Sequence, residues 1–211
     1  MNRETIQAEY DRGGYGLGWR FMMSPEASFG TATLAIVGLN PGGSRAHGTD
    51  WSYDDGNAYW RESWGGQPNG CAPLQRQVQG LAALLGRTEA DTFAAQFVPF
   101  RSPSWDELPN RRAAEQFAEN LWSSLLATPG PALYVCLGKA VVGPAIARIL
   151  GAKFENSHLV DWGNQTADRY VSQGGCVVVA LPHLGRFKLI GRPQSESAIL
   201  EAARPGVPVV I

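Results

Sequence analysis

The residues best suited to chemistry follow the first apolar run of the chain. Residues 34–38 predict a buried strand, and the Asn-Pro-Gly-Gly sequence that begins at Asn40 must leave this strand in a turn. Pro41 fixes its own φ and biases Asn40 toward extended geometry, while Gly42 and Gly43 let the backbone approach a ligand closely. A side-chain amide has no useful basicity near neutral pH, but its oxygen accepts hydrogen bonds. The turn predicts an amide held rigidly beside a small ligand, with a purely structural turn as the alternative.

A second polar side chain, His183, follows residues 176–181, which give the strongest strand signal of the chain. Its imidazole can donate a hydrogen bond in either the neutral or the charged form. The residues after it include Arg186, Lys188 and Arg192 without a carboxylate up to position 192. This stretch is the best local candidate for phosphate contact, and a solvated face is the alternative.

The overall charge limits how the chain could hold nucleic acid. Its 18 basic and 19 acidic side chains give a formal net charge of −1, whereas a chain that relies on bulk electrostatics is usually more basic. Any phosphate contact must therefore be local. Arg101, Arg111 and Arg112 form a second basic group, which Asp106 and Glu107 dilute.

Four apolar runs separated by helical patterns must position these side chains. The expected strands are 34–38, 97–100, 132–137 and 176–181, and the expected helices are 74–85, 114–125 and 195–203, with a further helix near Pro144. Continuously apolar strands that alternate with helices are typical of a parallel sheet covered on both faces. The sequence therefore predicts an α/β fold, a three-layer α/β/α domain with a central, mainly parallel four-stranded sheet. Ligands bind such sheets at the carboxyl ends of the strands.

Length and composition predict a single domain over residues 1–211, with residues 1–33 as an N-terminal covering segment. No apolar run approaches the roughly 20 residues that span a bilayer, and the polar N-terminus does not resemble a secretory signal. We therefore expect a cytoplasmic protein without a membrane partner. The three cysteines lie far apart in the sequence, so we expect them reduced, and they predict no metal site.

Four motifs occur in an order that resembles a known superfamily. Residues 38–42 read Gly-Leu-Asn-Pro-Gly, residues 57–60 read Asn-Ala-Tyr-Trp, residues 137–140 read Leu-Gly-Lys-Ala, and residues 181–187 read Leu-Pro-His-Leu-Gly-Arg-Phe. Over residues 34–190 the chain resembles the uracil-DNA glycosylase superfamily, and most closely its mismatch-specific uracil/thymine-DNA glycosylase branch. The first three motifs correspond to the family's Gly-Ile-Asn-Pro-Gly, Asn-x-Phe-Trp and Leu-Gly-Lys elements. The last departs from the family, because the Pro-Ser that grips DNA there is missing.

The resemblance implies a monofunctional DNA glycosylase that acts as a monomer on DNA in base excision repair, without a cofactor or a metal. Such enzymes extrude a uracil-like nucleotide into a pocket, because a base inside the duplex is unreachable. Cleavage of the glycosidic bond then develops positive charge on the sugar and negative charge on the base. The implied role of Asn40 is to aim a water molecule at the anomeric carbon, and that of His183 is to donate to the O2 oxygen of the departing pyrimidine.

The resemblance also assigns binding residues. Base contact is expected from Leu39, Trp51, Tyr53 and Tyr59, since an extruded base needs an aromatic surface to stack on. DNA contact is expected from Gly42, Gly43, Ser44, Leu184, Gly185, Arg186 and Lys188. Of these, Leu184, or alternatively Phe187, is expected to fill the space that the extruded base leaves.

Two other readings of the sequence stay open. The chain could be a catalytically silent relative that binds a nucleobase, a nucleotide or single-stranded nucleic acid, which the near-neutral charge and the missing Pro-Ser favour. It could also be an unrelated α/β hydrolase or transferase. The second reading has little support, because the sequence contains no Gly-x-Ser-x-Gly elbow and no phosphate-binding Gly-Lys-Ser/Thr loop.

Overall fold

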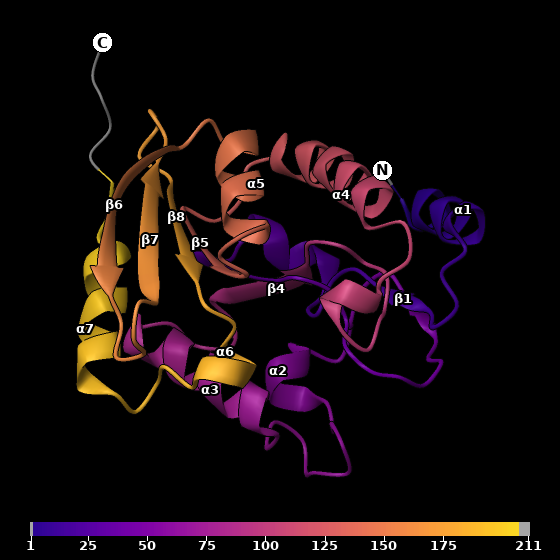
Figure 1. The fold of residues 1–211 in the computed structure, drawn as a ribbon, viewed down its shortest axis with the longest axis horizontal. Coiled ribbons are helices and arrows are strands. Elements are labelled where there is room, and N and C mark those ends of the chain that lie inside the picture. Colours follow the sequence, from indigo (N-terminus) through magenta and orange to yellow (C-terminus); the bar gives the residue numbers. More distant parts are fainter. Residues whose placement is uncertain (1, 207–211) are drawn as a thin grey trace.

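A computed structural model describes residues 2–206 of the chain. Its main sheet has six strands in the order β4-β2-β5-β8-β7-β6 (Figure 1). The first four are parallel to one another, and they are β4 (Thr92–Gln96), β2 (Leu34–Gly38), β5 (Leu133–Leu137) and β8 (Val177–Leu181). The last two run antiparallel, and they are β7 (Thr166–Val171) and β6 (Lys153–Leu159).

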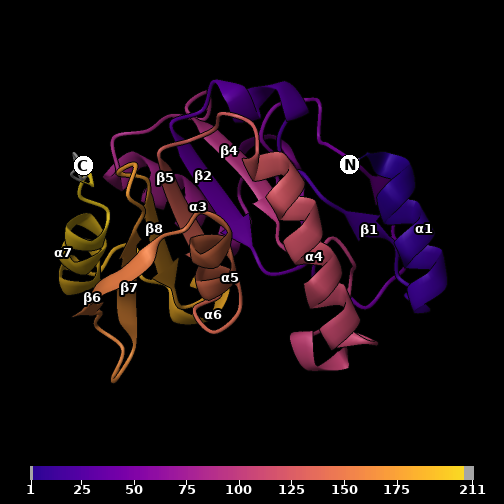
Figure 2. The ribbon, with the colours of Figure 1, turned by 90° about the horizontal axis from the view of Figure 1, so that it is seen from above.

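Helices flank both faces of this sheet (Figures 1 and 2). One face packs against α4 (Arg111–Leu126) and α5 (Val142–Ile149). The other face packs against α2 (Ala58–Arg61), α3 (Pro73–Leu84), α6 (Leu184–Phe187) and α7 (Pro193–Ala202). Successive strand residues supply the two cores in turn, because side chains alternate across a strand: Ala35 and Val37 join one core, and Leu34 and Ile36 join the other.

The predicted fold class is confirmed as α/β with a mainly parallel sheet between helices, but the number of strands was wrong. The structure has six strands rather than four. The two additional strands, β6 and β7, form a hairpin at the edge of the sheet, and β6 is exposed along nearly its whole length. An exposed strand of mixed polarity lacks the apolar run that marks a buried parallel strand, so here the sequence indicated only a possible short strand near residues 157–160.

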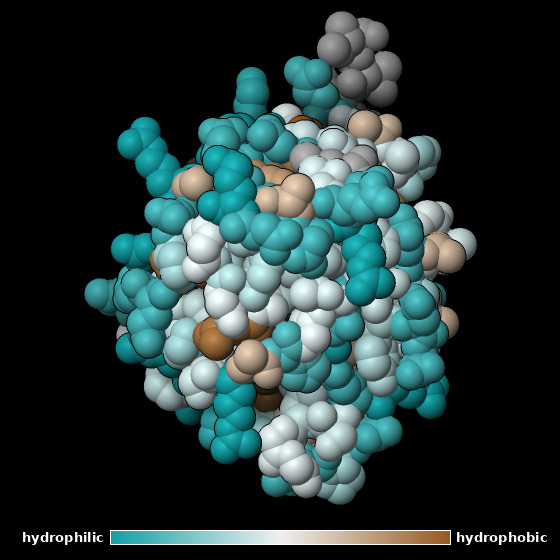
Figure 3. Space-filling view, turned by 90° about the vertical axis from the view of Figure 1, so that its right-hand side faces the viewer, coloured by the Kyte–Doolittle hydropathy of each residue, from teal (hydrophilic) through white to brown (hydrophobic). Residues whose placement is uncertain are grey.

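The remaining elements lie outside the main sheet and its flanking helices. They are α1 (Arg3–Gly13), the short strands β1 (Trp19–Arg20) and β3 (Thr49–Asp50), which pair in parallel, and the 3₁₀ helices η1 (Glu26–Gly30) and η2 (Trp105–Glu107). Met22 forms a bridge with Ala95 of β4, so the segment around Met22 covers the outer edge of that strand. Figure 3 shows that the face on the α1 side is mostly hydrophilic. None of the helices within residues 2–206 has the length and apolar character needed to cross a membrane.

The strand registers bring the site residues together. Gly38 lies opposite Gln96 on one side and opposite Leu137 on the other, and Leu137 lies opposite Leu181. The four parallel strands therefore end at the same level. The loops that leave them, including the Asn40 turn, start from one edge of the sheet, which is where ligands bind in sheets of this kind.

Candidate functional site

A cavity of about 1030 Å³ lies at this carboxyl edge of the parallel strands. The loop after β2, the end of β4, helix α2 and the start of α6 all contribute to its lining. Both sequence-predicted catalytic residues, Asn40 and His183, line it. Two side chains that are far apart in the sequence thus face one space that is large enough for a small molecule.

Asn40 is held in a single orientation. Its Nδ2 donates to the Phe100 carbonyl at 3.2 Å, to the Pro41 carbonyl at 3.3 Å and to Ser102 Oγ at 2.8 Å. Because carbonyl oxygens only accept hydrogen bonds, the amide nitrogen must be on this side. The Asn40 oxygen has no hydrogen-bond partner among residues 2–206. It is therefore the group left to accept a hydrogen bond from a ligand or a water molecule.

His183 is the N-cap residue of α6. Its Nδ1 accepts a hydrogen bond of 3.2 Å from the Gly185 N–H, so in the neutral ring the proton must be on Nε2. Although the residue is exposed at the rim of the cavity, desolvation by the surrounding protein lowers the pKa of His183 below its ordinary value. A neutral imidazole near pH 7 with a hydrogen-bond donor at Nε2 follows from these two facts.

Gln96, the last residue of β4, also lines the cavity, and the sequence analysis missed it. Its side chain is 6% exposed, and its Oε1 is buried without a hydrogen-bond partner among the described residues. Gly38 makes room for it, since a Cβ at that position would lie 2.4 Å from Gln96 Oε1. The expected strand at 97–100 begins one residue after the true end of β4, and this error placed Gln96 outside the strand.

An aromatic wall completes this part of the cavity. Tyr59 of α2 is 2% exposed, and its ring meets that of Trp64 edge-on with centroids 5.2 Å apart. Burial raises the pKa of Tyr59, so its hydroxyl stays protonated. Leu39 also lines the cavity. Asn57, from the motif that precedes Tyr59, accepts from the Tyr59 N–H at 3.1 Å and caps α2.

A charged group lies on another side of the cavity. Arg20 is buried and forms ion pairs with Asp50 at 2.9 Å and with Glu62 at 2.7 Å. Arg101 lines the cavity as well, and its Nη1 donates to the Gly42 carbonyl. Burial and the nearby Arg20 cation lower the pKa of Arg101. The Nε of Arg101 is buried and has no hydrogen-bond partner among the described residues.

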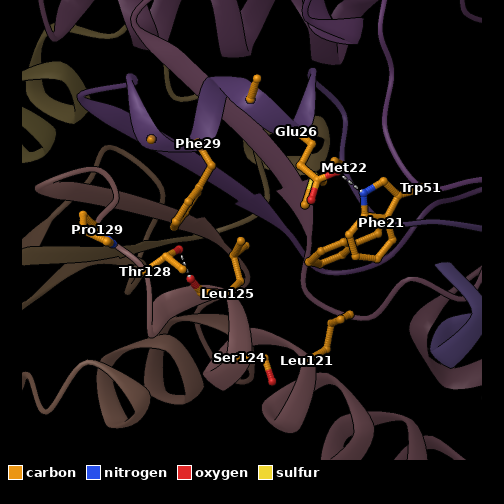
Figure 4. Close-up of a pocket in the computed structure, with 12 residues that line it drawn as sticks. Phe21, Met22, Glu26, Phe29, Trp51, Leu121, Ser124, Leu125, Thr128 and Pro129 are labelled. Carbon is orange, nitrogen blue, oxygen red and sulfur yellow. Dashed lines mark hydrogen bonds between the residues drawn. The ribbon is translucent and has the colours of Figure 1, made fainter. Parts of the chain in front are cut away.

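Two of the expected base-binding aromatics do not line this cavity. Trp51 lies in a separate pocket of about 440 Å³ between η1 and α4, where its Nε1 donates to Glu26 Oε2 at 2.7 Å and its ring packs 5.4 Å from that of Phe21 (Figure 4). Tyr53 lies under the guanidinium of Arg20, whose Cζ is 5.8 Å from the ring centre. The loop is long enough to turn these rings away from the strand ends, and its sequence does not specify their direction.

The expected DNA-binding residues divide into three groups. Gly42, Gly185 and Arg186 line the cavity, whereas Gly43, Ser44 and Lys188 are exposed but do not line it. Leu184 is fully buried in the core beneath α6, so it cannot serve as an exposed wedge. The alternative wedge, Phe187, is half-buried, and its ring packs edge-on against Trp162. The apolar side chain of Leu184, in the first turn of this short helix, packs into the core.

No group of three or more histidine, cysteine, aspartate or glutamate side chains within residues 2–206 is arranged to hold a metal ion. The comparisons with known proteins give no relative: no protein-family model matches the chain, and no curated protein matches it significantly.

Proposed function

We propose that the chain is a monofunctional DNA glycosylase that hydrolyses the N-glycosidic bond of uracil, or of a related deaminated or mismatched base. The observation that supports this most is that the Asn40 oxygen, the His183 imidazole and the Gln96 amide belong to one cavity. Hydrolysis needs a positioned water, stabilisation of the departing base and recognition of its edge. These three side chains have the hydrogen-bonding capacity for those three tasks.

Each group suits its task by what it can donate or accept. The Asn40 oxygen can accept a hydrogen bond from a water molecule, which aims the lone pair of that water at the anomeric carbon. The Nε2–H of His183 can donate to the pyrimidine oxygen that gains negative charge. The Gln96 amide offers a donor and an acceptor, which is the complement of the adjacent carbonyl and N–H groups on the edge of uracil.

The finer parts of the proposal follow from the same assignment. The four parallel strands would correspond to the central sheet of uracil-DNA glycosylases, and the β6–β7 hairpin would be an extension of it. We propose DNA as the partner, a monomeric state, a cytoplasmic location and a reaction that needs no cofactor.

A catalytically silent relative is the second candidate, and one observation favours it. Leu184 is buried and the alternative wedge, Phe187, packs against Trp162, so neither apolar side chain expected as the wedge is fully exposed. A protein without a wedge is poorly equipped to hold a base out of a duplex. Such a protein could bind a nucleobase, a nucleotide or single-stranded nucleic acid in the same cavity.

Release of the base tests the proposal. Labelled oligonucleotides that carry uracil, thymine opposite guanine, hypoxanthine or xanthine are incubated with the purified protein in single- and double-stranded form, and abasic sites are scored by alkaline cleavage. We expect uracil to be released. Binding of these oligonucleotides without release of any base would support the silent relative instead.

A further inference from the structure

Arg101 has a guanidinium that the protein leaves incompletely paired. It lines the cavity, and its Nη1 donates to the Gly42 carbonyl. Its Nε is buried, yet it finds no acceptor among residues 2–206. The nearby carboxylates of Asp50 and Glu62 are both engaged by Arg20, and no carboxylate in this described part of the chain forms an ion pair with Arg101. Arg101 therefore has hydrogen-bond donors and a positive charge to offer a ligand.

The position of Arg101 links it to the Asn40 turn. Gly42, whose carbonyl it contacts, is two residues after Asn40, and Ser102, the next residue in the chain, holds the Asn40 amide. The φ of Gly43 is +119°, and a Cβ there would lie 3.5 Å from Arg101 Nη1. The guanidinium therefore lies against the same turn that orients the Asn40 oxygen. A group bound by Arg101 would therefore lie beside the turn that carries Asn40.

The other two arginines of this basic group differ from Arg101. Arg111 forms an ion pair with Asp106 at 2.6 Å, and Arg112 is exposed at the start of α4 and does not line the cavity. The volume of about 1030 Å³ lies at the upper end of the range for small-molecule sites. It has room for more than a single base.

We propose that Arg101 forms a phosphate subsite of this cavity, which binds a phosphate that flanks the nucleoside contacted by Asn40 and Gln96. A guanidinium binds phosphate oxygens through its N–H donors, and the terminal Nη2 of Arg101 donates to no acceptor among the described residues. The inference rests on the proposed function for the identity of the neighbouring nucleoside and for the DNA strand. The ligand recognised is then a nucleotide unit rather than a free base, and the phosphate belongs to a DNA strand.

Replacement of single phosphates tests the subsite. Oligonucleotides carry 2′-fluoro-2′-deoxyuridine, which resists hydrolysis, and a neutral methylphosphonate on its 5′ or its 3′ side. Fluorescence anisotropy gives the affinity of the unaltered protein, of Arg101→Gln and of Arg112→Gln as the matched surface control. We expect one of the two methylphosphonates to weaken binding by the unaltered protein and by Arg112→Gln about tenfold, as for a lost hydrogen bond to a charged group. Arg101→Gln should bind the normal oligonucleotide about tenfold more weakly. The same methylphosphonate should then weaken the binding of this variant only slightly further.

The outcome separates this inference from the proposed function. If Arg101→Gln loses affinity with each methylphosphonate as much as the unaltered protein does, the subsite is refuted, even if uracil is released. If the affinity losses caused by Arg101→Gln and by the methylphosphonate are not additive but no base is released, the subsite stands and the glycosylase proposal fails. Deoxyuridine and its 5′-monophosphate, compared by calorimetry, distinguish the source of the phosphate. If Arg101 increases the affinity for the monophosphate over deoxyuridine but contributes nothing to the affinity for the oligonucleotides, the assignment of the phosphate to a DNA strand is overturned.

Discussion

Asn40 Nδ2 donates a hydrogen bond of 2.8 Å to Ser102 Oγ, although 62 positions separate the two residues. Ser102 is buried, and its own hydroxyl proton goes to the Ser104 carbonyl at 2.7 Å. Ser102 Oγ can therefore only accept from Asn40, and this requires the nitrogen side of the amide to face it. The loop after β4 thus determines which atom of Asn40 is directed to a ligand.

Removal of the Asn40 amide is expected to abolish most of the proposed activity. Asn40→Ala should lower kcat for uracil release by roughly 100-fold or more, because the attacking water is no longer positioned. Asn40 is half-buried and lies in a turn, so the fold should persist. The measurements are single-turnover base release and the circular dichroism spectrum of the variant. Activity within a few-fold of the unaltered protein would rule out this role for Asn40.

Ser102 is expected to act through Asn40 rather than on the substrate. Ser102→Ala removes one of the three acceptors of the amide, and a single neutral hydrogen bond contributes about 0.5–1.5 kcal/mol. We expect kcat to fall about 2- to 12-fold with little change in KM. Ser104→Ala is the control, since it retains the backbone carbonyl to which Ser102 donates. In the background of Asn40→Ala, the Ser102 substitution should have no further effect on kcat, and a full additional loss would contradict the coupling.

Gln96 is expected to recognise the ligand and not to stabilise the fold. Its Oε1 is buried without a partner among the described residues, so Gln96→Met should leave the unfolding temperature unchanged or raise it. The same variant should raise KM for uracil-containing DNA about tenfold, because the edge of the base loses its hydrogen bonds.

Gln75 provides the matched control for Gln96. It is equally buried, but its amide binds the Ala58 and Glu62 carbonyls at 2.8 and 2.7 Å and the Ala72 N–H at 2.9 Å. Gln75→Met should lower the free energy of unfolding by about 1–3 kcal/mol, because it leaves these backbone groups unpaired. A comparable destabilisation in Gln96→Met would mean that Gln96 has a structural role.

The pH dependence follows from the His183 ring. Since folding lowers the pKa of His183, the unfolded chain binds more protons than the folded chain as the pH falls below about 6.5, the ordinary histidine pKa. The contribution of neutral His183 to the stability of the fold is therefore present above that pH, and it is lost as the pH falls through the lower pKa of the folded state. Protonation of Nδ1 would also break the cap to the Gly185 N–H. We expect activity to fall on the acid side, with a midpoint below 6.5, and this acid limb to disappear in His183→Asn, which keeps a capping side chain.

The sequence predicted three of the four parallel strands and, of the edge hairpin, only a possible short strand near residues 157–160 that overlaps β6. Buried parallel strands are continuously apolar, and this located β2, β5 and β8 to within one residue. Strand β4 begins with Thr92 and ends with Gln96, so the apolar residues that follow it gave the stronger but misplaced signal. Asn40 and His183 were selected because they follow the clear strands, and both line the cavity. Gln96 was not considered because its strand was placed too late, and Trp51 lies outside the cavity because sequence does not specify how a loop turns its rings.

Leu184 gives a final prediction that separates packing from DNA contact. Its side chain is fully buried against the core beneath α6, so Leu184→Ala should lower the free energy of unfolding by about 2–5 kcal/mol. At a temperature where the variant is folded, the ratio of activity on duplex to activity on single-stranded DNA should match that of the unaltered protein. A true wedge would instead lose duplex activity selectively, because it occupies the space of the extruded base. Arg186→Ala is the comparison: Arg186 is exposed and lines the cavity, so its loss should weaken DNA binding and change the stability by no more than about 0.5 kcal/mol.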